Sequence, residues 1–173
     1  HHHWDHTGGI DALLVSFPDI PVYGPQNKNI NQITVRLSQD DNLELPQFDL
    51  KFSVLEIPGH TLDHIAYYGD IGLFCGDTLF SAGCGRLFEG TPQQMFTSLA
   101  KLTALPADTA VYCAHEYTMA NIAFAEAAEP NNQALIDYKH WASKQREKNI
   151  PTLPSNIHRE LEVNPFLRCN SRE

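Results

Sequence analysis

Three consecutive histidines open the chain, and an aspartate and a fourth histidine follow at once in the stretch HHHWDH. On an extended segment alternate residues project to the same side, so His1 and His3 can bind one ion together. Asp5 and His6 lie at the following bend and can point to a second position nearby. Neutral imidazole nitrogens and a carboxylate suit zinc, and also iron or manganese. The stretch therefore indicates a metal site.

A purification tag is the alternative explanation, because terminal histidine runs are often remnants of expression. A tag accounts for His1 to His3, but it has no use for Asp5, for His6 or for the glycine pair that follows. A metal site makes a further demand, since it requires additional ligands elsewhere in the chain. The sequence meets this demand, which favours the metal site.

Three residues of metal-binding type each follow a predicted strand. His60 lies in the turn of PGHT, Asp77 ends an apolar strand in FCGDT, and His115 lies where the last predicted strand meets a helix in AHE. Such residues at three strand ends are rare by chance. They indicate a site assembled from distant segments.

The elements that must position these residues are predicted from hydrophobic periodicity. A helix begins at Thr91, because TPQQ supplies an N-cap, a proline in the first turn and a capping box. Other helices are predicted over 8–18, 116–128 and 131–148. Predicted strands cover 21–25, 33–37, 48–54, 65–70, 71–77 and 110–114.

The character of the chain changes after His115, from strand-rich to helical. We therefore predict two domains. Residues 1–115 form a strand-rich, metal-binding domain, and residues 116–173 form a small helical domain.

Composition excludes several functional classes. The 173 residues carry a formal net charge of −9 with no basic run, which argues against nucleic acid as the partner. No segment approaches the roughly 18 apolar residues of a membrane span. The four cysteines have no paired spacing and are expected to be reduced thiols, as in the cytoplasm, with mitochondria as the other possibility.

Four motifs in order, HHHWDH, PGHT, GDT and AHEY, resemble the metallo-β-lactamase superfamily. Within it, PGHTLDHIAYY, LFCGDTLFSAGCGRLFEGTPQQM, CAHEYTMANIAFA and PTLPSNIHRELEVNPFLR are similar to the glyoxalase II family of hydroxyacylglutathione hydrolases. The likeness spans nearly the whole chain. It implies an α/β (α+β) fold, an αββα sandwich followed by a small helical domain at 116–173 that binds substrate.

The resemblance also implies two divalent metal ions, with zinc expected first and iron or manganese as alternatives. The implied ligands are His1, His3 and His60 for one ion, Asp5, His6 and His115 for the other, and Asp77 as a bridge. Asp5 and Asp77 are then the catalytic residues, with a hydroxide bridging the ions as nucleophile. The implied reaction hydrolyses S-D-lactoylglutathione to glutathione and D-lactate, the second step of methylglyoxal detoxification.

Three residues match substrate-binding positions of the family. Arg86 supplies a cation for the anionic glutathione, and Tyr117 matches a substrate-binding tyrosine. Phe88 stands where some members have a second tyrosine. A small-molecule partner and a monomer are expected, without nucleic acid or membrane.

Neighbouring residues receive simpler interpretations. His64 is expected to be a strand histidine that forms hydrogen bonds behind the site. Asp63 stands where the motif has glycine and is expected only to alter a turn, while His2 is expected to point away from the ions.

Two alternatives to the thioesterase stay open. One is a persulfide dioxygenase of the same superfamily, which uses a single iron. The other is a truncated chain that binds metal without turnover, because family members have strands before the first histidine and basic residues beyond the NPFLR segment. We expect a fragment that lacks both, with an incomplete sheet, open edges and exposed apolar faces.

Overall fold

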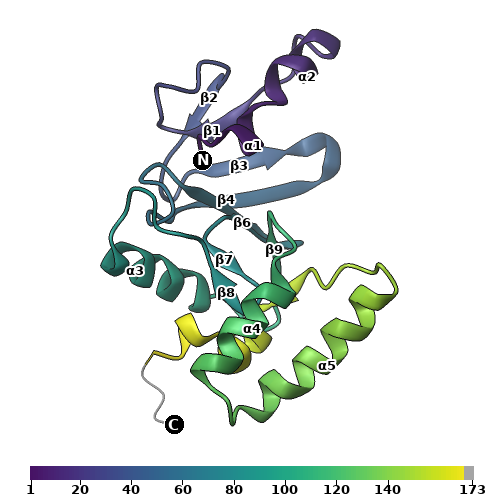
Figure 1. The fold of residues 1–173 in the computed structure, drawn as a ribbon. Coiled ribbons are helices and arrows are strands. Elements are labelled where there is room, and N and C mark those ends of the chain that lie inside the picture. The colour runs from purple at the N-terminus through teal and green to yellow at the C-terminus, as the bar shows by residue number, and fades with distance from the viewer. Residues whose placement is uncertain (170–173) are drawn as a thin grey trace.

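The computed structural model describes residues 1–169, and its centre is a six-stranded mixed sheet (Figure 1). The strand order is β10–β9–β6–β5–β4–β3. These strands are β3 (Asn42–Leu45), β4 (Leu50–Glu56), β5 (Ile65–Gly69), β6 (Gly72–Gly76), β9 (Ala110–Cys113) and β10 (Ser155–Asn156).

The pairing of β6 with β9 is parallel, and the other neighbours in this sheet are antiparallel. Leu73 of β6 lies opposite Val111 of β9, and both are fully buried. Because these two strands run side by side in the same direction, their carboxyl ends meet at one edge. Asp77 follows β6 directly and His115 follows β9 by two residues, so the pairing brings both toward the same place.

Helix α3 (Pro92–Thr103) packs on one face of the sheet. Its start has the capping box predicted from sequence, in which Gln94 N donates to Thr91 Oγ1 and the Gln94 side chain accepts from Thr91 N. Apolar residues at helical spacing then face the sheet. This core contains Met95, Leu99 and Leu102 of the helix, with Ile57, Leu73 and Val111 from the sheet side.

The opposite face carries smaller elements near the N-terminus. These are α1 (Trp4–Thr7), α2 (Ile10–Ser16), the 3₁₀ turn η1 (Pro46–Phe48) and a two-stranded parallel sheet of β1 (Tyr23–Pro25) and β2 (Val35–Leu37). An open apolar groove of about 460 Å³ lies between α2 and the sheet. Ile10, Leu13 and Leu14 line it from the helix, which lies within the helix predicted over 8–18.

The C-terminal part is mainly helical and lies beside the hairpin of β7 (Leu79–Phe80) and β8 (Gly83–Cys84) (Figure 1). It contains α4 (Thr118–Ala128), α5 (Gln133–Glu147), α6 (Ile157–Val163) and the 3₁₀ turn η2 (Pro165–Leu167). Its own core includes Ile122, Leu135 and Tyr138, and it takes in Ala82 from the hairpin. Among residues 1–169, no helix has the length and apolar character that crossing a membrane requires.

A buried carboxylate joins α6 to the hairpin. Glu160 is fully buried, and its oxygens accept hydrogen bonds from Ala82 N at 2.8 Å and Asn164 Nδ2 at 3.0 Å. The hydroxyls of Ser81 and Ser155 also donate to it. Four donors from three separate segments therefore converge on one side chain.

Two predictions about the elements were wrong. Asp5 and His6 lie in the short helix α1 rather than at a bend, because the N–H groups of His6 and Thr7 turn back to the carbonyl oxygen of His3. The strand at 110–114 is not the last, since β10 pairs with β9.

Candidate metal centre

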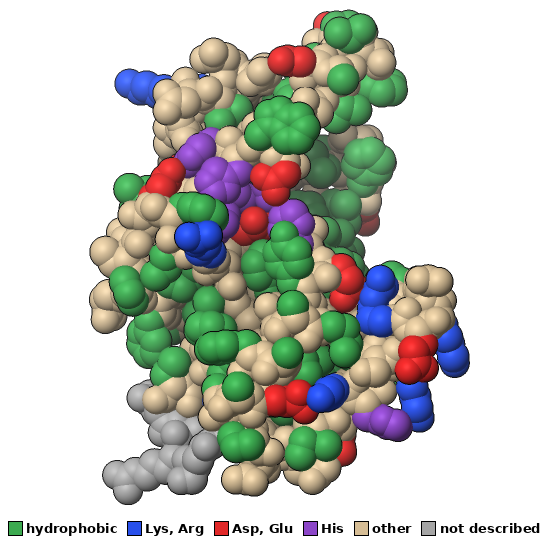
Figure 2. Space-filling view, in the orientation of Figure 1, with side chains coloured by type: hydrophobic (Ala, Val, Ile, Leu, Met, Phe, Trp, Pro, Cys, Tyr) green, Lys and Arg blue, Asp and Glu red, His purple; other side chains and the backbone are tan. Residues whose placement is uncertain are grey.

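Histidine and carboxylate side chains gather at one place on the surface, below α1 and α2 (Figure 2). They come from the segment around α1, from the turn before β5, and from the carboxyl ends of β6 and β9. The structure places all seven predicted ligands in this cluster.

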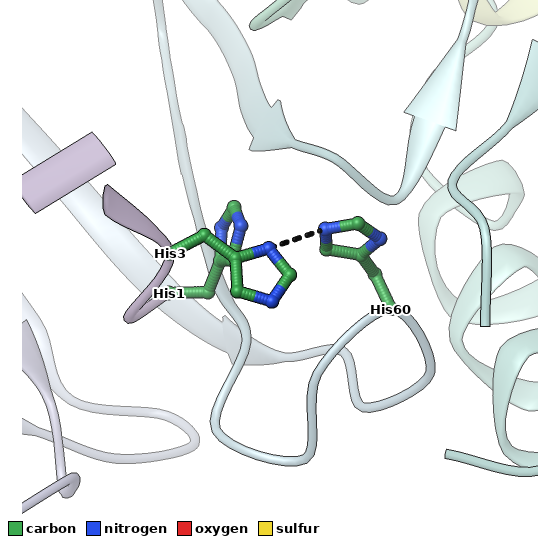
Figure 3. Close-up of side chains that lie close together, drawn as sticks. All are labelled: His1, His3 and His60. Atoms are coloured by element: carbon green, nitrogen blue, oxygen red, sulfur yellow. Dashed lines mark hydrogen bonds between the residues drawn. The ribbon is translucent and has the colours of Figure 1, made fainter. Parts of the chain in front are cut away.

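The first group consists of His1, His3 and His60, whose ligand atoms lie within 4.8 Å of one another. His1 and His3 project from the N-terminal segment toward His60, which reaches them from the facing loop (Figure 3). His60 Nε2 lies 3.1 Å from His3 Nδ1.

The second group consists of Asp5, His6, Asp77 and His115. His115 Nε2 lies 3.3 Å from Asp5 Oδ2, and His6 Nε2 lies 3.6 Å from the same oxygen. Two ligand atoms that share a tetrahedral ion at about 2.0–2.1 Å are about 3.4 Å apart. The spacing therefore matches a coordination site.

Asp77 lies between the two groups, and its oxygens face different ones. Oδ2 lies 3.4 Å from His60 Nε2 and 4.0 Å from His1 Nε2. Oδ1 lies 3.3 Å from His6 Nε2 and 3.4 Å from His115 Nε2. One carboxylate thus has an oxygen available to each group.

Local backbone geometry fixes the place of Asp77. Gly76 adopts a positive φ of 50°, and a Cβ there would lie 2.7 Å from the ring of His64. Glycine permits both the turn and this close approach. The amide of Asp77 then donates a 3.0 Å hydrogen bond to His64 Nε2. His64 lies just before β5 rather than in it, but its hydrogen bond lies behind the site as predicted.

A second hydrogen bond orients His60. Its Nδ1 lies 2.7 Å from the carbonyl oxygen of Arg86, so Nδ1 carries the proton and donates. Nε2 is then left as the free acceptor that faces the cluster. Metal-binding histidines are commonly oriented by such a bond on the other ring nitrogen.

Two histidines of the cluster, His6 and His60, favour the neutral state that a metal requires. Burial lowers the pKa of His6 and of His60 below the ordinary value, against the nearby carboxylates that raise it. Burial likewise lowers the pKa of His64 to about 3, which suits its role as an acceptor.

Several polar atoms of the cluster are buried without a hydrogen-bond partner. Within residues 1–169, the side-chain atoms in this state are His1 Nδ1, His1 Nε2, His6 Nε2 and Asp77 Oδ1, together with Oγ1 of Thr78, which is not one of the proposed ligands. Buried polar atoms are normally satisfied, and exceptions need an explanation such as a bound ion. Nitrogen and carboxylate donors at coordination spacing fit divalent metal ions, which would supply the missing partners.

The three predicted substrate residues border the cluster. Phe88 packs edge-on against His3 and His60, with ring centroids 5.3 and 5.2 Å away, and the Arg86 guanidinium lies 5.0 Å from the Phe88 ring centroid. Tyr117 stacks on His115 with centroids 4.9 Å apart. All three are exposed, so an incoming molecule can reach them beside the metal ligands.

Sequence analysis missed the role of Asp63, which does more than alter a turn. Its carboxylate accepts hydrogen bonds from Thr61 Oγ1 at 2.5 Å and Asn27 Nδ2 at 2.8 Å, and it contacts His2 Nδ1 at 3.0 Å. Burial acts to raise the pKa of Asp63, but these hydrogen bonds outweigh it and lower the pKa. The carboxylate therefore stays ionised. The signal in the sequence was the aspartate at position 63 of PGHTLDH, where the motif has glycine.

Comparison with protein families yields two matches that meet between residues 115 and 116. Residues 1–115 match the metallo-beta-lactamase superfamily, and residues 116–173 match the hydroxyacylglutathione hydrolase C-terminus.

Individual proteins agree with these matches. A hydroxyacylglutathione hydrolase of Nitrosomonas eutropha is 56% identical over 98% of this chain and 66% of its own length. One of Vibrio parahaemolyticus is 54% identical over 99% of this chain and 67% of its own length. The crystal structure of the BLEG-1 B3 metallo-beta-lactamase superposes with a TM-score of 0.67 at 24% identity, over 96% of this chain and 74% of that one. This last similarity concerns the fold alone.

Proposed function

Because the chain belongs to the hydroxyacylglutathione hydrolase family of the metallo-β-lactamase superfamily, we propose that it takes part in hydrolysing glutathione thioesters. S-D-lactoylglutathione is the substrate we place first, with glutathione and D-lactate as products. The chain spans about two thirds of the length of these relatives, 66% in the first, so this activity is proposed for the whole protein. We also keep the division at residue 115, with the helical part contributing to substrate binding.

The observation that carries the proposal is the position of Asp77 between two groups of ligands. His1, His3 and His60 would hold one divalent ion, Asp5, His6 and His115 would hold the other, and Asp77 would contact both. Zinc is our first choice for the ions. When bound, two such ions polarise a carbonyl oxygen and lower the pKa of water to near neutrality.

The residues of this chain perform the remaining tasks. His64 holds the backbone of Asp77, and the carbonyl of Arg86 keeps the proton of His60 on Nδ1. The side chains of Phe88 and Tyr117 pack against His60 and His115 and offer aromatic surfaces to a substrate beside the cluster. The leaving group of a thioester is a thiolate whose conjugate acid has a pKa of about 8.5, so the residues of this site need not protonate it.

Arg86 is an exposed cation whose guanidinium packs on Phe88, which in turn contacts the proposed ligands His3 and His60. Replacing it with alanine is expected to raise KM for S-D-lactoylglutathione about tenfold while kcat stays within about twofold. The reason is that one charge-assisted contact to the anionic glutathione is lost, worth about 1.4 kcal/mol. The backbone carbonyl that orients His60 remains in this variant.

Steady-state kinetics over a range of substrate concentrations measure this effect. Lys144→Ala is the matched control, because this exposed cation lies on α5 within the helical part. It should leave both constants unchanged. A fall in kcat with unchanged KM in Arg86→Ala would contradict a role in substrate binding.

The proposed function is tested by a thioesterase assay on S-D-lactoylglutathione together with metal analysis of the same sample. We expect thioester loss and two equivalents of metal. Two bound metals without thioester loss would refute the thioesterase. A single iron with oxygen consumption on glutathione persulfide would instead favour the dioxygenase alternative. Asp5 argues against that alternative, because its carboxylate lies 3.3 Å from His115 Nε2 and so belongs to a second group of ligands.

A further inference from the structure

His2 stands between two proposed metal ligands, but its ring turns to other partners. His2 Nδ1 lies 3.0 Å from Asp63 Oδ1, and His2 Nε2 lies 3.0 Å from Glu89 Oε1. Both contacts are partly shielded from water, since the side chains of His2 and Asp63 are 28% and 13% exposed. A single imidazole thus bridges two carboxylates from distant parts of the chain.

The two carboxylates hold the loop that carries His60. Asp63 accepts from the hydroxyl of Thr61, the residue after His60. Glu89 Oε2 accepts from the backbone N–H of Leu62 at 2.8 Å. Both bonds fix residues within two positions of a proposed ligand.

The segment that contains Glu89 also lies along the same loop. Phe88 N donates to the carbonyl oxygen of His60, and Gly90 N donates to that of Gly59. His2 therefore connects the N-terminal histidines to a pair of loops that are already bonded to each other. Arg86 and Phe88, the proposed substrate contacts, lie on the second of these loops.

We propose that His2 is a positioning residue, which holds His1 and His3 against the 60–63 loop so that the three histidines converge on one ion. The proposal rests on the metal site of the proposed function. His1 and His3 reach His60 from a separate segment, so their convergence depends on links between that segment and the loop. The contacts of His2 are links of this kind, and hydrogen bonds to ionised carboxylates are among the strong ones.

A third metal ion at His2, Asp63 and Glu89 is the competing explanation, because these residues also lie close enough to hold one. One imidazole nitrogen binds one ion, however, and here each ring nitrogen faces a different carboxylate. The ring therefore links the two carboxylates to each other from its two sides.

The test compares zinc affinity in His2→Ala, in Glu89→Gln and in the double variant, measured by competition with a chelator. We expect the ion at His1, His3 and His60 to be held about 10- to 100-fold more weakly in each, as for other residues that orient ligands. The double variant should be no weaker than His2→Ala, because His2→Ala already removes the His2–Glu89 contact and the side-chain oxygen of a glutamine can still accept from Leu62 N. His140→Ala, an exposed histidine on α5, is the control and should match the unmodified protein.

Cobalt(II) substitution separates positioning from general stability. The shifted imidazole proton resonances of His60 should move in His2→Ala, while those of His115 stay in place. A lower melting temperature of the metal-free protein with unchanged zinc affinity would overturn the proposal. So would a third zinc equivalent that His2→Ala removes. None of these measurements uses a substrate, so their outcome is independent of whether the protein is a thioesterase.

Discussion

Replacing Asp77 with alanine is expected to abolish thioester hydrolysis and reduce the metal content from two equivalents to one or none. Asp77 offers one oxygen to each group of histidines, so its loss removes a ligand from both proposed ions at once. It would also remove the one negative charge that both groups of ligands share, which would otherwise offset the repulsion between two bound cations. We expect kcat/KM to fall at least about 1,000-fold, the equivalent of about 4 kcal/mol.

Metal analysis and the thioesterase assay should be made on the same samples. Asp70→Ala is the matched control, since Asp70 is an exposed aspartate in the turn between β5 and β6. It should retain both metals and full activity. Turnover retained in Asp77→Ala would refute the bridging role of Asp77.

Replacing Glu160 with alanine is expected to lower the free energy of unfolding by about 3–5 kcal/mol. The change leaves Ala82 N and the Ser155 hydroxyl without this acceptor in the interior, while Ser81 keeps its contact with Tyr138, and each unsatisfied buried group costs about 1–3 kcal/mol. It also opens a cavity beside Asn164. Urea unfolding of the metal-free protein measures the loss without a contribution from bound ions.

Glu160→Gln is the comparison that preserves volume, and its loss should be smaller. Burial raises the pKa of Glu160 above its ordinary value, against the hydrogen bonds that lower it. Because the pKa of Glu160 is higher in the folded state, the folded protein holds this proton more tightly than the unfolded chain does. The stabilisation that results is complete below the unfolded-state pKa of about 4.5, and it is lost as the pH rises through the folded-state pKa. The stability of the unmodified protein relative to Glu160→Gln should therefore fall as the pH rises from 4.5. A difference independent of pH would contradict the raised pKa.

The metallo-β-lactamase fold and the family were predictable because their signals lie in short contiguous motifs. The strand of FCG followed by Asp77, and the capped helix that begins at Thr91, depend on residues within a few positions of one another. The clustering of ligands at strand ends followed from the same motifs, and the structure places all seven together. Their assignment to two ions stays a prediction.

Features that depend on distant partners were not predictable. The two residues of β10 have no periodicity, and only their pairing with Ala110 and Val111 makes them a strand. The same reason applies to Asp63, whose partner His2 lies 61 positions away. Helix α1 was not predicted, because a single turn of four residues is too short to show the periodicity of a helix.

The two-residue strand β10, the shortest in the six-stranded sheet, covers the edge of β9. β9 would be an edge strand without β10, with unpaired backbone groups at Ala110 and Val111, the residues that begin the strand. Exposed edges invite pairing with other chains. Cleavage by a protease before Ser155 would uncover this edge, and such a product should self-associate into aggregates even where its metal ligands are intact. We therefore expect the segment that contains β10 to protect the chain from aggregation by covering the edge of β9.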